Sequence, residues 1–203
     1  MSCRPDLLPA LFLDRDGVLV EEHGYLTHWA QFTIFQNTIN ALLRLEPFSC
    51  WRIVVTNQSA VARGLLAPAE LEALHRRLLE YFAAHGVTLH RVFACPHLPC
   101  PDLPGGRVEY LRPCRCRKPE PGLIEQAFEV FPIDRSRSFL VGDAERDVEA
   151  GQRAGLTTIR LCPPGKPVPQ TRAQHLVPDL GTAVDIFLNS IASKPSRVPR
   201  NHR

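Results

Sequence analysis

The stretch Leu11-Phe12-Leu13-Asp14-Arg15-Asp16-Gly17-Val18 decides the fold of this chain. In it an apolar run ends abruptly in two aspartates, Asp14 and Asp16, followed by Gly17, which suits a sharp turn. Buried strands of parallel sheets have such apolar runs, and ligands of open α/β sheets bind outside the carboxyl ends of the strands. The stretch therefore predicts a buried strand that delivers two carboxylates, close enough to share a cation, into a binding site.

Outward from this stretch, apolar runs alternate with helical patterns along most of the chain. Strands are expected at residues 11–14, 52–56, 91–94, 138–141 and 157–160. Helices are expected at residues 37–45, 68–85, 121–131, 145–154 and 179–191. Strands that alternate with helices form parallel sheets. The sequence thus predicts an α/β fold with a doubly wound, Rossmann-like, mostly parallel sheet and no second domain.

Length and composition narrow the class of protein. The 203 residues suffice for one domain, expected at residues 1–192, with a net charge of only +3. Residues 193–203 are basic and contain proline and serine, so a disordered tail is predicted rather than a nucleic-acid-binding arm. No stretch approaches the ~20 apolar residues that cross a bilayer, and the first residues lack the layout of a signal peptide. We expect a cytoplasmic monomer without membrane contact.

The carboxylates at the strand ends suit phosphoryl transfer. Asp14 is the predicted nucleophile, because a carboxylate can attack phosphorus and form an aspartyl-phosphate. Asp16 is the predicted general acid for the leaving alkoxide, and then the base for the attacking water. Asp143 follows the apolar residues 138–141 and would help to hold Mg²⁺, which prefers oxygen ligands. Asp147 is a further metal ligand, a helix N-terminal charge or a partner of the ligands, and the sequence leaves these alternatives open.

Hydrogen-bond donors and cations complete the predicted site for phosphoryl transfer. Thr56 and Asn57 follow another apolar run and can donate hydrogen bonds to phosphate oxygens. Lys118 precedes an expected helix and is predicted to stabilise the transferring phosphoryl group. Its neighbour Arg117 suits a second anionic group on the substrate, because a guanidinium directs two donors at one oxyanion.

Four of the seven cysteines gather near one histidine in the sequence. An odd count in a protein of this kind indicates thiols or metal ligands rather than a disulfide framework. The segments Cys95-Pro96-His97 and Cys114-Arg115-Cys116 offer three thiolates and one imidazole, a set that binds structural Zn²⁺. A metal there would order the proline-rich residues 96–113. Cys100 is a competing ligand, and reduced cysteines without a metal are the alternative.

Over residues 11–161 these segments, in this order, resemble the motifs of the haloacid dehalogenase superfamily of phosphohydrolases. Cys-Pro-His followed by Cys-x-Cys-Arg-Lys-Pro-x-Pro-Gly, with His23-Gly24-Tyr25 and the segment from Thr56 to Gly64, more narrowly resembles the heptose 1,7-bisphosphate phosphatases. Histidinol-phosphate phosphatases are similar. The resemblance implies a cap-less, Mg²⁺-dependent phosphomonoesterase with a zinc-bound loop. It also implies that the main-chain carbonyl of Asp16 binds Mg²⁺. The implied substrate contacts are Glu22, His23, Gly24, Tyr25, Thr56, Asn57, Gln58, Ser59, Arg63, Arg117 and Lys118.

The predicted reaction is removal of the 7-phosphate from a heptose 1,7-bisphosphate through an aspartyl-phosphate. Histidinol phosphate or another small sugar phosphate is the alternative substrate, and a nucleic-acid end-processing or binding module is the alternative of a different class. One departure bears on the substrate: Ala144 stands where the family commonly has lysine. Arg146 is a nearby cation, but the expected helix would point it elsewhere.

Overall fold

Six parallel strands form the sheet of the computed structural model, which describes residues 6–192. The strands are β1 (Ala10–Leu13), β2 (Trp51–Asn57), β3 (Arg91–Cys95), β4 (Phe139–Gly142), β5 (Thr157–Leu161) and β6 (His175–Val177). The helices are α1 (Thr38–Leu43), α2 (Pro68–Ala84), α3 (Gly122–Val130), α4 (Glu145–Arg153) and α5 (Leu180–Ala192), with short 3₁₀ turns at Trp29–Gln31, Val108–Tyr110 and Arg135–Arg137. Cys3 and the expected tail at residues 193–203 lie outside the described residues.

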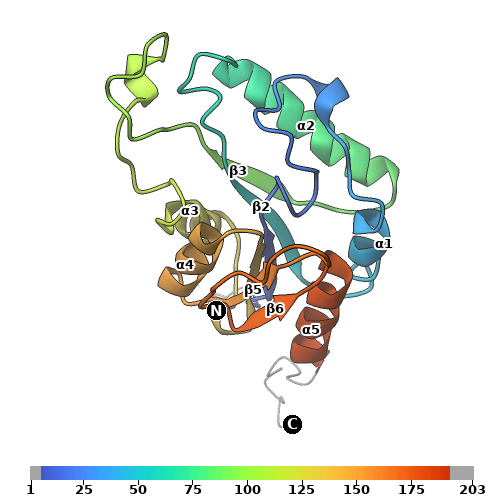
Figure 1. Cartoon of the computed structure of the whole chain (residues 1–203). Helices are drawn as coiled ribbons and strands as arrows, with labels where there is room; N and C mark the ends of the chain where they lie inside the picture. The colour runs from blue at the N-terminus through green and yellow to red at the C-terminus, as the bar shows by residue number, and fades with distance from the viewer. Residues whose placement is uncertain (1–5, 193–203) are drawn as a thin grey trace, which may run out of the picture.

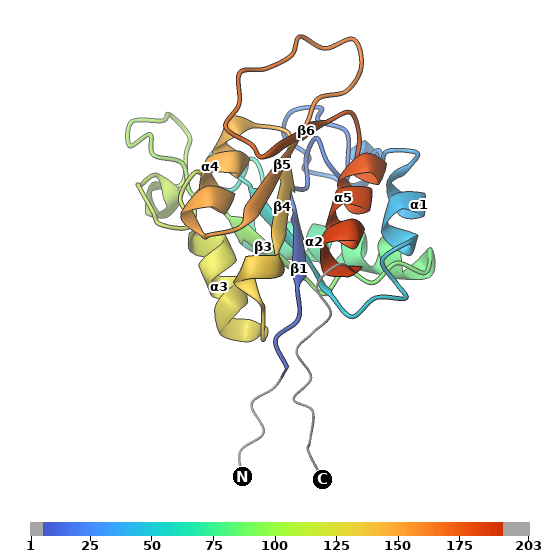
Figure 2. The ribbon, with the colours of Figure 1, turned by 90° about the horizontal axis from the view of Figure 1, so that it is seen from below.

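Helices cover both faces of the sheet, as the doubly wound prediction requires. Helices α3 and α4 pack on one face, and α1, α2 and α5 pack on the other (Figures 1 and 2). Alternate residues of β1 serve the two faces: Leu11 and Leu13 join the core under α1, α2 and α5, while Phe12 joins the core under α3 and α4. Each fully buried leucine or phenylalanine stabilises the fold by about 1.5–3 kcal/mol.

The strand order β3-β2-β1-β4-β5-β6 reverses direction between β1 and β4. The chain first runs outward from β1 to β3, then returns to β4 and runs outward to β6 on the other side. Loops leave a doubly wound sheet in opposite directions at such a switch point, and ligands bind in the crevice there. The carboxyl ends of β1 and β4 are therefore where a site is expected, and both are followed by aspartates.

The predicted elements are confirmed within a few residues at each boundary. The sequence prediction missed β6, because a three-residue edge strand has no apolar run of its own. Residues 96–113 form the long loop expected between β3 and α3, with only one short 3₁₀ turn in it. Among residues 6–192, none of the helices combines the length and the apolar character that a bilayer crossing demands.

Candidate active site

Asp14 and Asp143 meet at the switch point of the sheet. Each follows its strand directly, and the main-chain N–H of Asp14 donates to the Val141 carbonyl at 2.9 Å. Gly17 lets the two strand ends come together: it has a φ of +81°, and a Cβ there would lie 2.5 Å from the Asp143 carboxylate. The glycine of the opening motif is thus required both for its backbone conformation and for space.

A buried lysine bridges the carboxylates. The Nζ atom of Lys118 lies 2.8 Å from Asp14 Oδ1 and 2.7 Å from Asp147 Oδ1, and it donates to the Val55 carbonyl at 2.7 Å. Burial alone would lower the pKa of Lys118, but the Asp14 and Asp147 charges raise it. The lysine therefore stays cationic beside Asp14, where negative charge would accumulate during phosphoryl transfer.

Asn57 holds this lysine in place. Its side-chain Nδ2 donates to the Lys118 carbonyl and its Oδ1 accepts from the Lys118 N–H, both at 3.0 Å. The amide that we predicted as a phosphate donor is thus paired with the lysine backbone. Thr56, the other predicted donor, is buried, and its hydroxyl accepts from Gln58 at 2.9 Å.

Asp147 acts as a partner rather than an open ligand. It is completely buried in the first turn of α4. One carboxylate oxygen contacts Lys118, and the other accepts from the Ala144 N–H at 3.1 Å. Both oxygens are therefore engaged, which favours two of the alternatives that the sequence left open, the helix N-terminal charge and the partner of the ligands.

The carboxylates of Asp14, Asp143 and Asp147 form a group whose ligand atoms lie within 4.8 Å of one another. Burial raises the pKa of Asp14 to about 7 and that of Asp143 to about 6. The Oδ1 atom of Asp143 is buried and has no hydrogen-bond partner among the described residues. A divalent cation would satisfy this oxygen and offset the crowded charge, so the residues fit Mg²⁺.

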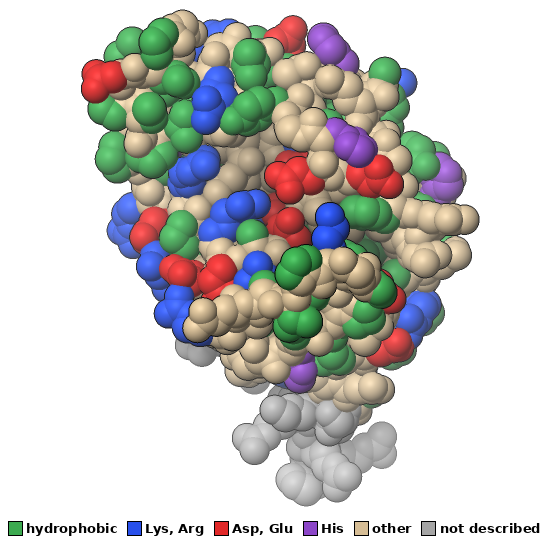
Figure 3. Space-filling view, viewed as in Figure 1, with side chains coloured by type: hydrophobic (Ala, Val, Ile, Leu, Met, Phe, Trp, Pro, Cys, Tyr) green, Lys and Arg blue, Asp and Glu red, His purple; other side chains and the backbone are tan. Residues whose placement is uncertain are grey.

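A cavity of about 250 Å³ opens over this group. Figure 3 shows acidic and basic side chains gathered beside one another on this face of the molecule. The cavity lining includes these predicted site residues: Asp14, Asp16, Glu22, Gly24, Tyr25, Thr56, Asn57, Gln58, Ser59 and Arg117. One cavity thus brings together side chains from the ends of β1 and β2 and from the loop before α3.

Our expectation that the helix would point Arg146 away from the site was wrong. Arg146 lines the cavity, and its guanidinium lies 3.9 Å from the Asp143 carboxylate. Three predicted substrate contacts lie outside the lining, and one of them, Lys118, is buried beside Asp14. His23 is exposed and pairs with Glu21 at 2.9 Å, whereas Arg63 stacks over the Tyr25 ring at 5.1 Å from its centre.

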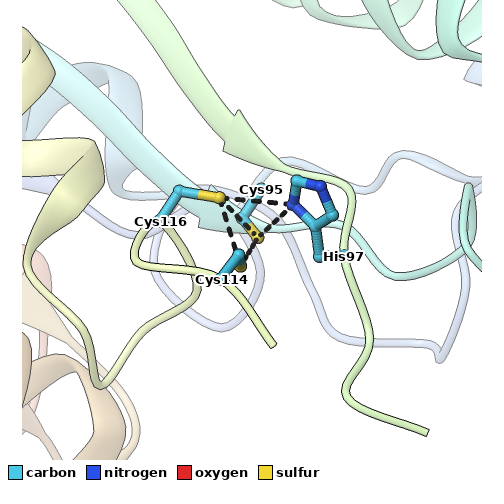
Figure 4. A group of neighbouring side chains, drawn as sticks. All are labelled: Cys95, His97, Cys114 and Cys116. Atoms are coloured by element: carbon cyan, nitrogen blue, oxygen red, sulfur yellow. Dashed lines mark hydrogen bonds between the residues drawn. The ribbon is translucent and has the colours of Figure 1, made fainter. Parts of the chain in front are cut away.

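The three cysteines and the histidine of the long loop converge (Figure 4). The Cys116 sulfur lies 3.1 Å from that of Cys95, 3.3 Å from that of Cys114 and 3.4 Å from His97 Nδ1. Hydrogen bonding with Cys95 lowers the pKa of Cys116 to about 5, toward the thiolate form that binds metals. Tetrahedral Zn²⁺ with bonds of about 2.3 Å separates its sulfur ligands by about 3.8 Å, and the three sulfur–sulfur distances here, 3.1, 3.3 and 3.5 Å, are a few tenths of an ångström shorter. Because three thiols and one imidazole converge on one point, these four residues fit a structural zinc after a small outward movement.

Comparison with known proteins agrees with this geometry. The HAD-hydrolase-like family model matches residues 115–182. The D-glycero-β-D-manno-heptose-1,7-bisphosphate 7-phosphatase of Escherichia coli K12 is 34% identical over 97% of this chain and 96% of its own length. The enzyme of that name from Pasteurella multocida is 37% identical over 93% of this chain and 96% of its own length. The chain belongs to this phosphatase family within the HAD-like hydrolases.

Solved structures give the same fold. A D,D-heptose 1,7-bisphosphate phosphatase from B. bronchiseptica, complexed with magnesium and phosphate, matches with a TM-score of 0.73 and 26% identity, over 91% of this chain and all of that one. A HAD-like protein from Mesorhizobium loti matches with a TM-score of 0.78 and 29% identity, over 97% of this chain and 94% of that one. As a member of this family, the chain is a phosphomonoesterase with a parallel sheet and no large cap.

Two buried residues beside the cavity of this chain were not predicted from the sequence. Arg15 separates the two motif aspartates and is only 1% exposed. His75 lies on the buried face of α2 and contacts the Arg15 guanidinium at 3.1 Å. His75 occurs four residues after Leu71 on the apolar face of the predicted helix, and a polar residue there was the available signal.

Proposed function

We propose that this phosphatase removes the 7-phosphate of D-glycero-β-D-manno-heptose 1,7-bisphosphate, the substrate in the names of its relatives. The single observation that carries the proposal is the charge of the cavity lining. Besides Asp14, the lining contains the guanidiniums of Arg117 and Arg146. Guanidiniums bind phosphate oxygens through paired donors. A substrate with a second phosphate, distant from the reacting one, uses all of these groups.

The first step breaks the bond between phosphorus and the sugar oxygen. Asp14 attacks phosphorus in line and becomes the aspartyl-phosphate, while the leaving oxygen takes a proton from Asp16. Lys118 and Thr56 stabilise the charge on the phosphoryl oxygens. In the second step Asp16 takes a proton from water, the water oxygen bonds to phosphorus, and the bond to Asp14 breaks. The products are the sugar monophosphate and inorganic phosphate.

We assign the ligands of Mg²⁺ to Asp14, Asp143 and the main-chain carbonyl of Asp16. When bound, this ion would neutralise the charge between nucleophile and phosphate. We assign a structural zinc to Cys95, His97, Cys114 and Cys116, which together would supply three thiolates and one imidazole. In support, Arg117 Nη1 donates to the His97 carbonyl at 2.9 Å, so an ordered loop would also hold the substrate-binding guanidinium.

The remaining lining residues suit a sugar. Glu22, Gly24, Tyr25 and Ser59 offer hydroxyl, carboxylate and backbone partners around the cavity. Histidinol phosphate carries an ammonium group, and two guanidiniums beside the cavity disfavour it. We further propose a monomer that works in the cytoplasm on a small phosphorylated molecule, without nucleic acid. The reduced cysteines of the loop suit such a reducing compartment.

The test is phosphate release, with Mg²⁺ present, from both anomers of heptose 1,7-bisphosphate, from histidinol phosphate and from a panel of sugar monophosphates. We expect kcat/KM for one heptose anomer to exceed all others by at least about a hundredfold, the order that one well-placed charged contact supplies. Weak and even activity across the panel would refute the substrate assignment, and a preference for histidinol phosphate would replace it.

A further inference from the structure

Arg15 is a buried cation that the reaction described above does not use. Its side chain is 1% exposed although it belongs to the motif at the cavity. A guanidinium is expensive to bury unless its donors are satisfied. Here they are: Nε donates to Asp16 Oδ1, and Nη2 to Asp16 Oδ2 and to Gln58 Oε1, each at 2.9 Å. The central carbon of the guanidinium lies over the Phe32 ring, 5.1 Å from its centre.

His75, on the buried face of α2, contacts the remaining nitrogen of this guanidinium. Its Nε2 lies 3.1 Å from Arg15 Nη1. Arginine has donors and no acceptor, so His75 Nε2 accepts this hydrogen bond and the imidazole is neutral. The environment agrees, because burial and the Arg15 charge lower the pKa of His75 to about 3. Helix α2 thus supplies an acceptor that fixes the orientation of Arg15.

The contacts of Arg15 fix the orientation of the Asp16 carboxylate. Its carboxylate receives the two hydrogen bonds from Arg15, and a third from Gln58 Nε2 to Oδ2 at 2.7 Å. A carboxylate has about four lone-pair sites. Three of them accept these hydrogen bonds, and Arg15 Nη2 also lies 2.8 Å from Oδ1. The side chain is still 18% exposed and lines the cavity, so its plane is fixed while part of the carboxyl group stays accessible from the cavity.

We propose that Arg15, held by neutral His75, is the positioning residue that orients Asp16 for proton transfer to the leaving oxygen. The proposal rests on the proposed function, in which Asp16 is the general acid. Proton transfer depends on distance and direction, and a positioned acid contributes about 10²–10⁴ in rate. Loss of the positioning contacts removes part of that factor without removing the acid.

The test compares leaving groups in three variants. Arg15→Lys keeps the charge but loses the paired donors. His75→Leu removes the acceptor, and His75→Gln keeps a neutral acceptor as the matched control. We would measure kcat/KM, which covers steps up to cleavage of the phosphorus–oxygen bond, for an alkyl sugar phosphate and for p-nitrophenyl phosphate. The aryl leaving group departs without a proton, so it does not need Asp16.

We expect Arg15→Lys and His75→Leu to lower kcat/KM for the alkyl substrate by about 10–100-fold and for the aryl substrate by less than about threefold. His75→Gln should restore the alkyl value to near that of the unaltered protein. An equal loss on both substrates would mean a structural role only and would overturn the proposal. Should His75→Leu fail to fold, as its melting curve would show, the ratio in Arg15→Lys decides.

The variant Asp16→Asn tests the general-acid role of Asp16 separately from the positioning role of Arg15. If Asp16→Asn spares the aryl substrate and the positioning variants do not, only the positioning role of Arg15 fails. If Asp16→Asn itself shows no dependence on the leaving group, Asp16 is not the general acid, and both the proposed mechanism and the positioning role fall.

Discussion

At the scale of the single residue, burial and ion pairing have opposite effects on the pKa of Asp14. Removal from water raises its pKa to about 7, and the Lys118 ammonium at 2.8 Å opposes that rise. We predict that Asp14→Asn lowers turnover by at least about a thousandfold, because an amide cannot attack phosphorus. The variant should stay folded, since asparagine has the same shape. Phosphate release and a melting curve check both parts, and activity within tenfold of the original would exclude Asp14 as the nucleophile.

The two guanidiniums of the cavity should distinguish a bisphosphate from a monophosphate. We predict that Arg117→Ala and Arg146→Ala each raise KM for the bisphosphate by about 10–100-fold, the value of a charged hydrogen bond. Arg153→Ala is the matched control, because Arg153 also lies on α4 but pairs with Glu120 outside the lining. Equal losses on a monophosphate that lacks the distal group would show that neither arginine reads a second phosphate.

The buried imidazole of His75 predicts a pH effect on stability. Its pKa falls from 6.5 to about 3 on folding, so the unfolded chain binds more protons between these values. Stability from this group is complete above pH 6.5 and is lost as the pH falls. At pH 5 the loss amounts to about 2 kcal/mol. His75→Gln should therefore lose less stability than the original protein between pH 7.5 and pH 5 in urea titrations, and identical pH dependence would contradict the assignment.

At the scale of the element, the loop between β3 and α3 joins the cysteine group to the cavity. The N–H of Gly122, the first residue of α3, donates to the Arg115 carbonyl at 3.0 Å. A Cβ on Gly122 would lie only 2.3 Å from that oxygen. On the other side, Arg117 donates to the His97 carbonyl. The order of this loop and the position of Arg117 are therefore coupled.

We predict about one Zn²⁺ per chain in the purified protein. Cys116→Ser should lose that zinc, expose the loop to proteolysis and raise KM for the bisphosphate, because Arg117 loses its anchored neighbour. Cys100→Ser is the control, since Cys100 is exposed and does not belong to the converging group. Metal analysis and limited proteolysis give the result. A folded protein that is free of zinc would refute the zinc assignment. Zinc loss in Cys100→Ser would show that Cys100 is itself a zinc ligand.

At the scale of the whole molecule, the described residues contain the sheet and the cavity at its switch point. We predict that deletion of residues 193–203 leaves kcat/KM within about twofold, because the groups to which the reaction is assigned, from Asp14 to Asp147, all belong to the described residues. The same deletion tests the alternative of a different class. Salt-sensitive DNA binding that disappears with Lys194, Arg197, Arg200 and Arg203 would support a nucleic-acid-binding arm.

Much of the fold could be predicted because its signals are local. Apolar runs, helical periodicity and the glycine after Asp16 depend on neighbouring residues, so five strands and five helices were predicted with small boundary errors. Strand β6 was missed because an edge strand of three residues is defined by its neighbour β5 and not by its own composition. Likewise, the chain order of strands indicated a doubly wound sheet, but their spatial order follows from packing.

The sequence by itself determined which groups stand at the strand ends, the carboxylates of Asp14, Asp16 and Asp143, and which cysteine and histidine residues we propose as zinc ligands. Only the tertiary structure decided how these groups are paired. It showed Asp147 engaged with Lys118, Asn57 clamping the lysine backbone, Arg146 turned into the cavity, and Arg15 buried against His75. The physical reason is that hydrogen bonding and burial depend on segments far apart in the chain, such as Arg15 and His75, which are 60 residues apart. Residue type limits what a group can do, and its surroundings determine which role it takes.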